Sequence, residues 1–209
     1  PKNIENWPQF LKNISNLNPL KVTSEDKKKT KQYEARFKFI KKSSNAKNKN
    51  QFLKSIKLRP KLIKINKSNI SRAAQLTQKT NQFNLTTKRY SVTDLNNTND
   101  LMFLISLKDI FGDHGIISFI KIKKISREIC LIDTFLMSCR ILGREIENWI
   151  LNEISYKCKK LGFKKILGNY IPTKKNVMVS NFYVNNNFKI QKKNTFLKNF
   201  KGKIFIKII

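Results

Sequence analysis

The sequence predicts an α/β (α+β) fold in which helices flank a mixed sheet. Three adjacent strand-like runs are followed by a helix, a strand, a second helix and two more strands, and this order is typical of an α/β layer. The third run is apolar on both faces, as a central strand should be. In chain order, the predicted segments are 102–107, 116–122, 128–137, 146–161, 165–170, 176–184, 188–190 and 203–208.

The segment after the central strand has the pattern of a helix with one buried side. Ile146, Trp149 and Ile150 recur at the spacing of successive helical turns, so they share one face. The first two strands are joined by Phe111-Gly-Asp-His-Gly115, a stretch rich in turn-forming residues. The strands before the helix are therefore expected to be neighbours joined by short connections.

Residues 1–68 are predicted to form a helical linker region that precedes a second unit, residues 69–209. A helix is expected from Thr23 or Ser24, which can cap it, and Tyr33, Phe37 and Ile40 follow at helical spacing. The remaining predicted segments are helices at 9–16, 52–56, 69–79 and 91–95, strands at 62–65 and 83–85, and a polar linker at 41–50.

The net charge of the chain is large, but it restricts the possible partners less than that large value suggests. There are 44 Lys and Arg residues against 13 Asp and Glu, a formal net charge of +31. The lysines accompany many Asn, Ile and Phe residues, whose codons are also A/T-rich, and they are spread over the chain. A nucleic-acid groove would concentrate them among exposed aromatics. Nucleic acid is therefore not the expected partner, whereas acidic proteins and phosphate-bearing cofactors remain candidates.

Other counts bear on location and metal binding. No apolar run approaches the roughly 18–20 residues that span a bilayer, and no signal pattern is present. Three cysteines without Cys-x-x-Cys spacing favour a reduced, cytoplasmic setting. The single histidine, His114, disfavours a His-based metal site or a Ser-His-Asp triad. Because the chain starts at Pro1, we expect a fragment or a processed product.

The most informative stretch is the turn Ser138-Cys-Arg-Ile-Leu-Gly-Arg-Glu145, which we call the arginine turn. It lies between the predicted central strand and the following helix. Free backbone N–H groups and the positive end of a helix dipole attract anions, and two guanidiniums beside them suit a phosphate. Arg140, Gly143 and Arg144 are therefore candidate ligands of an anion.

Two passages resemble a known family. Arg72-Ala-Ala-Gln-Leu-Thr-Gln-Lys-Thr-Asn-Gln-Phe-Asn-Leu-Thr-Thr-Lys-Arg-Tyr90 and Ile132-Asp-Thr-Phe-Leu-Met-Ser-Cys-Arg-Ile-Leu-Gly-Arg-Glu-Ile-Glu147 look like the C-terminal half of FkbH-like proteins, of the haloacid-dehalogenase-like (HAD) phosphatase subfamily IIIC. The resemblance covers about residues 20–190 and includes the turn-rich stretch at 111–115.

This resemblance implies a two-part parent protein. In the family, an N-terminal HAD-like domain with an Asp-x-Asp motif precedes a region that resembles GNAT-type N-acetyltransferases, and some members load a glyceryl unit onto an acyl carrier protein. This chain has no Asp-x-Asp. Phosphoryl or glyceryl chemistry of the family type is therefore expected upstream, and residues 69–209 are expected to form a GNAT-like domain with a mixed, mostly antiparallel sheet.

The resemblance also implies a cofactor and its ligands. Arg140-x-x-Gly143 matches the family motif Arg/Gln-x-x-Gly-x-Gly/Ala, whose backbone amides hold the pyrophosphate of coenzyme A, but Glu145 departs from its last position. Arg144 is a further candidate phosphate contact, and Asn176 lies near the cofactor-contacting Asn. Acyl-coenzyme A or a phosphopantetheine thioester is the implied cofactor, held between strands by backbone groups.

One catalytic role follows from the same resemblance, and further candidates come from the residues themselves. Tyr183 occupies the position of a general acid that protonates a leaving thiolate, and Asn187 replaces the Gly that ends the helix, as a left-handed residue can. Asp133, in the middle of the central strand, is a candidate base, and a structural ion pair with a lysine is the alternative. Cys139 and His114 are weaker candidates for covalent or acid–base roles.

Three functions remain open at this point. The first is an acyltransferase-like domain that binds coenzyme A or carrier-protein phosphopantetheine thioesters. The second is a non-catalytic domain of the same family that docks an acidic acyl carrier protein for the upstream HAD-like domain, and Glu145 favours it. The third is RNA binding through charge alone, which the diffuse lysines disfavour.

Overall fold

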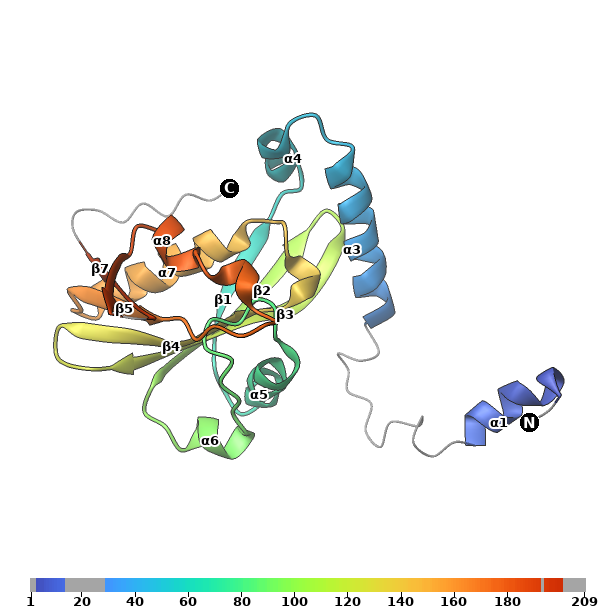
Figure 1. Cartoon of the computed structure of the whole chain (residues 1–209), viewed down its shortest axis with the longest axis horizontal. Coiled ribbons are helices and arrows are strands. Elements are labelled where there is room, and N and C mark those ends of the chain that lie inside the picture. Colours follow the sequence, from blue (N-terminus) through green and yellow to red (C-terminus); the bar gives the residue numbers. More distant parts are fainter. Residues whose placement is uncertain (1–2, 14–28, 193, 201–209) are drawn as a thin grey trace.

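One seven-stranded sheet organises the molecule. A computed structural model describes residues 3–13, 29–192 and 194–200. The strand order is β1-β2-β3-β4-β5-β7-β6, and all neighbours are antiparallel except β4 and β5 (Figure 1). The predicted mixed, mostly antiparallel sheet is confirmed. The strands are β1 (Arg59–Lys64), β2 (Leu101–Asp109), β3 (Gly112–Lys124), β4 (Ile129–Met137), β5 (Lys165–Asn169), β6 (Lys189–Lys192) and β7 (Thr195–Asn199).

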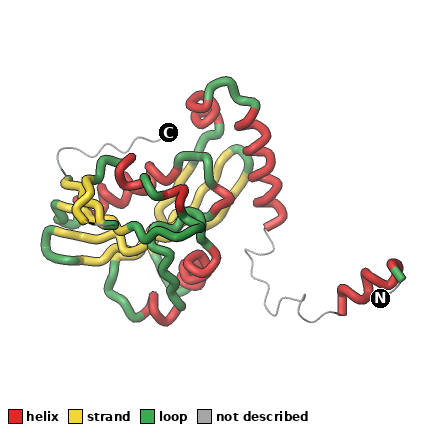
Figure 2. The backbone as a smooth tube through the Cα atoms, viewed as in Figure 1, coloured by secondary structure: helices red, strands yellow, loops and turns green. Residues whose placement is uncertain are grey.

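Helices cover both faces of this sheet (Figures 1 and 2). α5 and α6 pack on one face, where their apolar residues meet Leu104, Phe119 and Leu136. α4, α7 and α8 contribute to a larger apolar cluster on the other face. The helices are η1 (Ile4–Asn6), α1 (Trp7–Asn13), α3 (Lys29–Ser44), α4 (Lys49–Ser55), α5 (Ile70–Lys79), α6 (Val92–Asn96), η3 (Cys139–Ile141), α7 (Ile146–Lys160), η4 (Val177–Val179) and α8 (Phe182–Asn185).

The connection β4–α7–β5 creates the parallel strand pair on which the rest of the domain is arranged. Parallel strands need a long crossover, and a helix is the usual one. α7 buries Ile146, Trp149 and Ile150 as predicted, and it returns the chain so that Ile129–Ile132 of β4 pair with β5. The two strands share only this short stretch, so the C-terminal half of β4 needs another partner on that edge.

Several elements differ from the sequence-based prediction. The predicted linker 41–50 is mostly helical, because α3 continues through Ser44 and the Asn48 side chain caps α4 by accepting from the Gln51 amide. The predicted helix 176–184 is divided into η4 and α8. β7 was missed because only Phe196 in it is buried. The predicted strand 203–208 and the start of the predicted helix at 23–24 lie outside the described residues.

The division of the chain at residue 68 stays a prediction. β1 precedes that boundary and pairs with β2 through all of its residues. Phe39 of α3, with Leu53 and Ile56 at α4, also belongs to the larger apolar cluster. The region before residue 69 therefore contributes a strand and core side chains to the sheet domain.

Gly168 in β5 allows α8 to pack closely on the sheet. A Cβ at this position would lie 2.3 Å from the ring of Tyr183, so we expect Gly168→Ala to lower the free energy of unfolding by about 1–3 kcal/mol through overpacking. Urea unfolding measures the change. In a Tyr183→Ala background, the same substitution should cost much less, and an unchanged cost there would contradict the proposed contact.

Candidate functional site

The arginine turn leads from β4 into α7 and is covered by α3. Its first amide, that of Ser138, donates to the carbonyl of Ile117 at 2.8 Å, and Gly143 adopts a left-handed φ of 90°. Arg36 of α3 donates to the Cys139 carbonyl. A Cβ on Gly143 would lie 3.4 Å from the Phe39 ring. The turn is thus held against α3 rather than left open along its length.

Arg144 is fully buried and serves an internal ion pair. Its Nε lies 2.8 Å from a carboxylate oxygen of Asp109, and its guanidinium stacks 3.9 Å from the centre of the Phe39 ring. His114 Nε2 lies 2.9 Å from the same carboxylate. Burial raises the pKa of Asp109, but hydrogen bonds from His114 and Arg144 outweigh it and leave that pKa below its ordinary value.

This burial speaks against two sequence-based roles. No surface lies next to Arg144 at which a phosphate could meet its guanidinium, and His114, 1% exposed, is equally remote from a substrate. The Arg144 side chain holds the β2–β3 hairpin against the arginine turn, whereas the His114 side chain pairs with Asp109 within that hairpin. A buried ion pair of this kind keeps its charge only while the partner is present.

The other charged residues of the turn point in different directions. Arg140 is partly exposed and donates to the His114 carbonyl at 2.8 Å. Glu145, in a left-handed conformation at the start of α7, pairs with Lys49 at 2.6 Å. Glu147 follows in the first turn of the helix, and burial raises its pKa. Two carboxyl groups at this helix end offset its attraction for an anion.

The edge of β4 beyond Ile132 is already paired within the chain. The Leu85 amide donates to the Phe135 carbonyl at 3.0 Å, and the Met137 amide donates to the Phe83 carbonyl at 2.9 Å, with Asn84 bridging Leu136 in antiparallel fashion. We call residues 83–86 the edge segment. A thioester held by backbone groups at this edge of β4 would have to displace the edge segment, and the placement of a thioester between strands stays a prediction.

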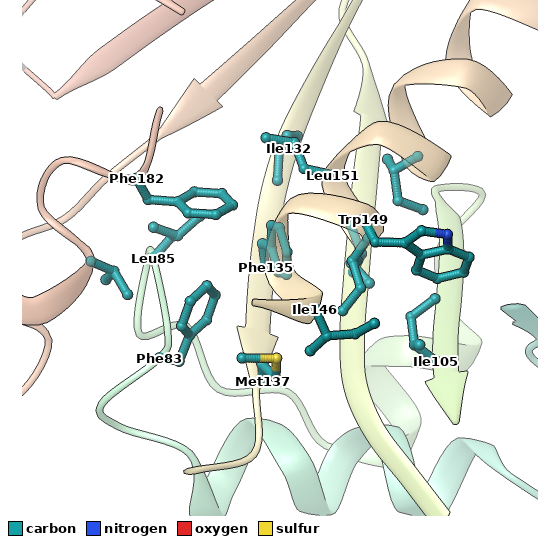
Figure 3. Close-up of a cluster of buried hydrophobic side chains, with 14 of the residues drawn as sticks. Phe83, Leu85, Ile105, Ile132, Phe135, Met137, Ile146, Trp149, Leu151 and Phe182 are labelled. Atoms are coloured by element: carbon teal, nitrogen blue, oxygen red, sulfur yellow. The ribbon is translucent and has the colours of Figure 1, made fainter. Parts of the chain in front are cut away.

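Side chains fix the edge segment as firmly as its backbone does. Phe83, Phe135 and Phe182 converge from three elements (Figure 3), with ring centres 5.2–5.6 Å apart. Phe83 is 3% exposed and Leu85 is fully buried. Removing both side chains from the core costs about 3–6 kcal/mol, which is roughly a 10²- to 10⁴-fold loss for any ligand that displaces them.

Asn176 ties the edge segment to the loop after β5. Its amide nitrogen donates to the Asn84 carbonyl at 2.8 Å and to the Ile171 carbonyl at 3.0 Å. Its amide oxygen accepts from the Thr173 amide at 2.7 Å. The side chain is fully buried, and its donors and acceptor are used internally. The structure therefore gives Asn176 a structural position instead of the predicted cofactor contact.

Tyr183 lies behind β5 and not at an open surface. It is 1% exposed, its hydroxyl has no hydrogen-bond partner among the described residues, and burial raises the pKa of its phenol. Phe188 and Phe196 pack against its ring. Asn187 has a φ of 63°, as predicted for this helix end. The geometry speaks against proton donation to a bound thiolate in this conformation.

Asp133 sits on a β-bulge and is surrounded by cations. In the β3–β4 ladder, Lys121 faces Thr134 while Ile122 faces Ile132, so Asp133 is the extra residue. Its carboxylate is 2.6 Å from Lys88 Nζ and accepts from the Tyr90 hydroxyl. Burial raises the pKa of Asp133, but those two hydrogen bonds and the nearby lysines outweigh it and bring the pKa to about 2. The structure thus favours the ion-pair alternative over a general base.

An open cleft of about 680 Å³ lies beside the arginine turn, between α3 and α5. It is lined by five cations and, among the described residues, by no carboxylate. Cys139 is exposed at its wall, and Tyr33 and Gln32 of α3 form another part. The five cations are Arg72, Lys79, Arg140, Lys174 and Lys175. We call this region the cationic cleft, and its charge suits a phosphate group.

The described residues fit a phosphate-bearing group only in part. The cationic cleft provides charge, and Arg140 belongs to it. The paired edge of β4 and the two carboxyl groups at the start of α7 do not fit a coenzyme laid between the strands. The described part of the chain also holds no cluster of three His, Cys, Asp or Glu side chains suited to a metal ion, and no helix in it could cross a membrane.

Comparisons with known proteins identify the fold. No family model matches the sequence, and no curated protein matches it. Among solved structures, an acetyltransferase of the GNAT family from Staphylococcus aureus is similar over 68% of this chain and 100% of its own, with 13% identity and a TM-score of 0.52. The ribosomal-protein-S18-alanine N-acetyltransferase from Escherichia coli matches over 66% and 91%, with 9% identity and a TM-score of 0.50.

A third structure is N-acetylglutamate synthase from Neisseria gonorrhoeae, solved with coenzyme A and N-acetyl-glutamate. It matches 68% of this chain but only 35% of its own, with 10% identity and a TM-score of 0.53. These likenesses show that the chain has the fold of GNAT acetyltransferases, as predicted. At these identities, they establish the fold and leave the reaction open.

The cationic cleft was not predicted as a unit from the sequence. Arg72 and Lys79 lie on the same face of α5 about two turns apart, and Lys174 and Lys175 follow β5, so nothing local connects them to Arg140. One sequence signal could have indicated part of the cleft. The segment from Arg72 to Asn81 contains two cations, Arg72 and Lys79, and leads into an unusual polar stretch. The edge segment was predicted as strand-like, but its partner was not.

Asp133 should make stability depend on pH in the acidic range. Its folded-state pKa of about 2 lies below the ordinary value, so its contribution is complete above about pH 4 and is lost as pH falls through about 2. We expect Asp133→Asn to lower the free energy of unfolding by about 2 kcal/mol at pH 7 and by about 1 kcal/mol less at pH 3. Urea unfolding at both pH values measures this.

Glu128→Gln is the matched control, because Glu128 forms an exposed ion pair with Lys164. Such pairs contribute about 0–1 kcal/mol, so we expect a small effect at either pH. A cost for Asp133→Asn that is the same at pH 3 and pH 7 would show that the carboxylate does not have the depressed pKa.

The edge segment should be among the most protected parts of the chain. The amides of Leu85 and Met137 are hydrogen-bonded in the core, so we expect their hydrogen exchange to be among the slowest measured by NMR. Amides of residues 45–47, between α3 and α4, are the fast-exchanging reference. Exchange of Leu85 and Met137 at the rate of that reference would mean that the segment readily leaves β4.

Proposed function

We propose that this chain is an acyltransferase-fold domain that binds a phosphate-bearing thioester carrier at the cationic cleft. The ligand class comprises coenzyme A and the phosphopantetheine arm of an acidic acyl carrier protein. The observation that carries the proposal is the set of five cations that line one open cleft, with no carboxylate among the described residues of that lining. Guanidinium and ammonium groups both neutralise a phosphate and hydrogen-bond its oxygens.

Two further observations support a thioester carrier over other anions. The chain has the fold of GNAT acetyltransferases, and one structure with that fold was solved with coenzyme A. The sequence passages at 72–90 and 132–147 resemble FkbH-like proteins, in which carrier proteins are loaded. We therefore propose an FkbH-like parent that supplies an upstream HAD-like domain and acts in the cytoplasm.

The geometry favours carrier binding over acyl transfer by this chain alone. A transferase needs a reacting thioester next to a proton donor or a base. In this conformation, Tyr183 is buried and its hydroxyl has no hydrogen-bond partner in the part of the chain that the structure describes, and Asp133 is neutralised by Lys88. The edge segment also fills the β4 edge. Acyl transfer remains a second candidate because the chain has the fold of GNAT acetyltransferases, and it requires the edge segment to move.

Binding can be measured by titrating coenzyme A into the purified chain in a calorimeter at low salt. We expect Arg140→Ala and the double variant Lys174→Ala with Lys175→Ala each to weaken binding about 10-fold or more, since a hydrogen bond to a charged group contributes about 1.5–3 kcal/mol. Affinity should also fall as salt rises, because part of it is ionic.

A charge-matched control separates this cleft from general charge attraction. The double variant Lys189→Ala with Lys192→Ala removes two exposed lysines from β6 and should leave the affinity unchanged. Equal losses in both double variants would indicate diffuse attraction to any polyanion, and an absence of binding by the wild type would refute the proposal. Release of free thiol from acetyl-coenzyme A by the wild type would favour the transferase candidate.

A further inference from the structure

The cations of the cationic cleft are distributed along α5 instead of converging on one point. Arg72 and Arg140 both donate to the Ile116 carbonyl, at 3.1 Å and 3.4 Å, so their guanidiniums lie together. Lys79 follows Arg72 by seven residues of the same helix, which is about 10 Å along the helix axis. The cleft therefore offers positive charge over a length that exceeds a single phosphate group.

The positive charge continues beyond the cleft. Lys174 and Lys175 line the cationic cleft and also an adjoining hollow of about 360 Å³. Arg89 lines the same hollow, and its guanidinium donates to the side chain of Asn81. Among the described residues, no carboxylate lines the hollow. We call the cleft and the hollow together the cationic track, which Lys174 and Lys175 connect.

An exposed aromatic ring and side-chain amides accompany this charge. Tyr33 of α3 is 65% exposed and lines the cleft. Its helix is held to the arginine turn, because Arg36 donates to the Cys139 carbonyl. Gln75 and Gln82 line the cleft as well. An exposed ring on a fixed helix can stack on a nucleobase, and amides have the donors and acceptors that pair with base edges.

We propose that the cationic track binds a single-stranded nucleic acid. Sites of this kind combine a positively charged groove for the backbone with aromatic side chains on which bases stack, and the track has both. The lysines are spread over the sequence, but the fold gathers cations of α5, the arginine turn and the loop after β5 beside one exposed ring. The inference goes beyond the proposed function, and both ligands would share the cationic cleft.

The test measures binding of end-labelled oligouridine and oligothymidine of about 12 nucleotides to the full chain, by fluorescence anisotropy at several salt concentrations. For single strands, each phosphate contact contributes about 0.7 to the slope of log affinity against log salt. The double variant Lys174→Ala with Lys175→Ala should therefore reduce the magnitude of that slope by about 1.4. The double variant Lys189→Ala with Lys192→Ala, on the exposed strand β6, should leave it unchanged.

Tyr33→Ala tests stacking separately from charge. We expect it to weaken binding of the oligonucleotides about 5- to 100-fold, and we expect Tyr33→Phe, which keeps a ring, to retain most of the affinity. Phe37→Ala is the matched control, because Phe37 is 69% exposed on the same helix and is not part of the cleft lining. Inorganic polyphosphate has repeated phosphates but no bases, so Tyr33→Ala should bind it as the wild type does.

The outcomes separate this inference from the proposed function. Binding of either oligonucleotide with both dependences supports the inference. Failure of the wild type to bind oligonucleotides while it binds coenzyme A overturns the inference alone. Oligonucleotide binding that Tyr33→Ala leaves unchanged, or that loses as much salt dependence in the β6 double variant, overturns it as well. An equal loss of polyphosphate binding in Tyr33→Ala would also overturn it, since the ring would then not recognise bases.

Discussion

The pairing of the β4 edge is the constraint on which the rest of the domain depends. β5 follows β4 only as far as Ile132, and buried N–H and C=O groups beyond that point must find other partners. The edge segment provides them from the α5–α6 connection, and Asn176 secures it from the loop after β5. These hydrogen bonds thereby join three parts of the chain, and the edge segment fills the space beside β4 where β5 no longer pairs with it.

A second constraint operates at the arginine turn. Its two arginines differ in exposure: Arg144 is fully buried against Asp109, while Arg140 is partly exposed at the cationic cleft. The buried pair of Arg144 and Asp109 fixes the turn to the β2–β3 hairpin. Arg144 thereby helps to hold Arg140 in place at the cleft. This arrangement moves positive charge from the start of α7 towards α5 and α3, and the proposed ligand site in the cleft rests on that distribution.

The sequence was sufficient for the elements with strong local patterns. The apolar run of β4, the buried face of α7 and the short helix α6 were all predicted and confirmed. Properties that depend on distant partners could not be predicted. The burial of Arg144 depends on Asp109 from a hairpin, and the fate of the edge segment depends on β5 ending its pairing early. The sequence matches the pyrophosphate-binding motif of the resembled family at Arg140 and Gly143. Its departure at the last position, Glu145, indicated that this turn differs from the turn of that family.

The edge segment also affects how the domain reaches its native state. Its partner strand lies about 50 residues further along the chain, so this pairing is a long-range contact, and such contacts slow folding. Until it forms, β4 is a two-sided apolar strand with one bare edge, which is the kind of surface that recruits other chains. A damaged edge segment would therefore be seen first as a poor yield of soluble protein, before any change in what the folded domain can bind.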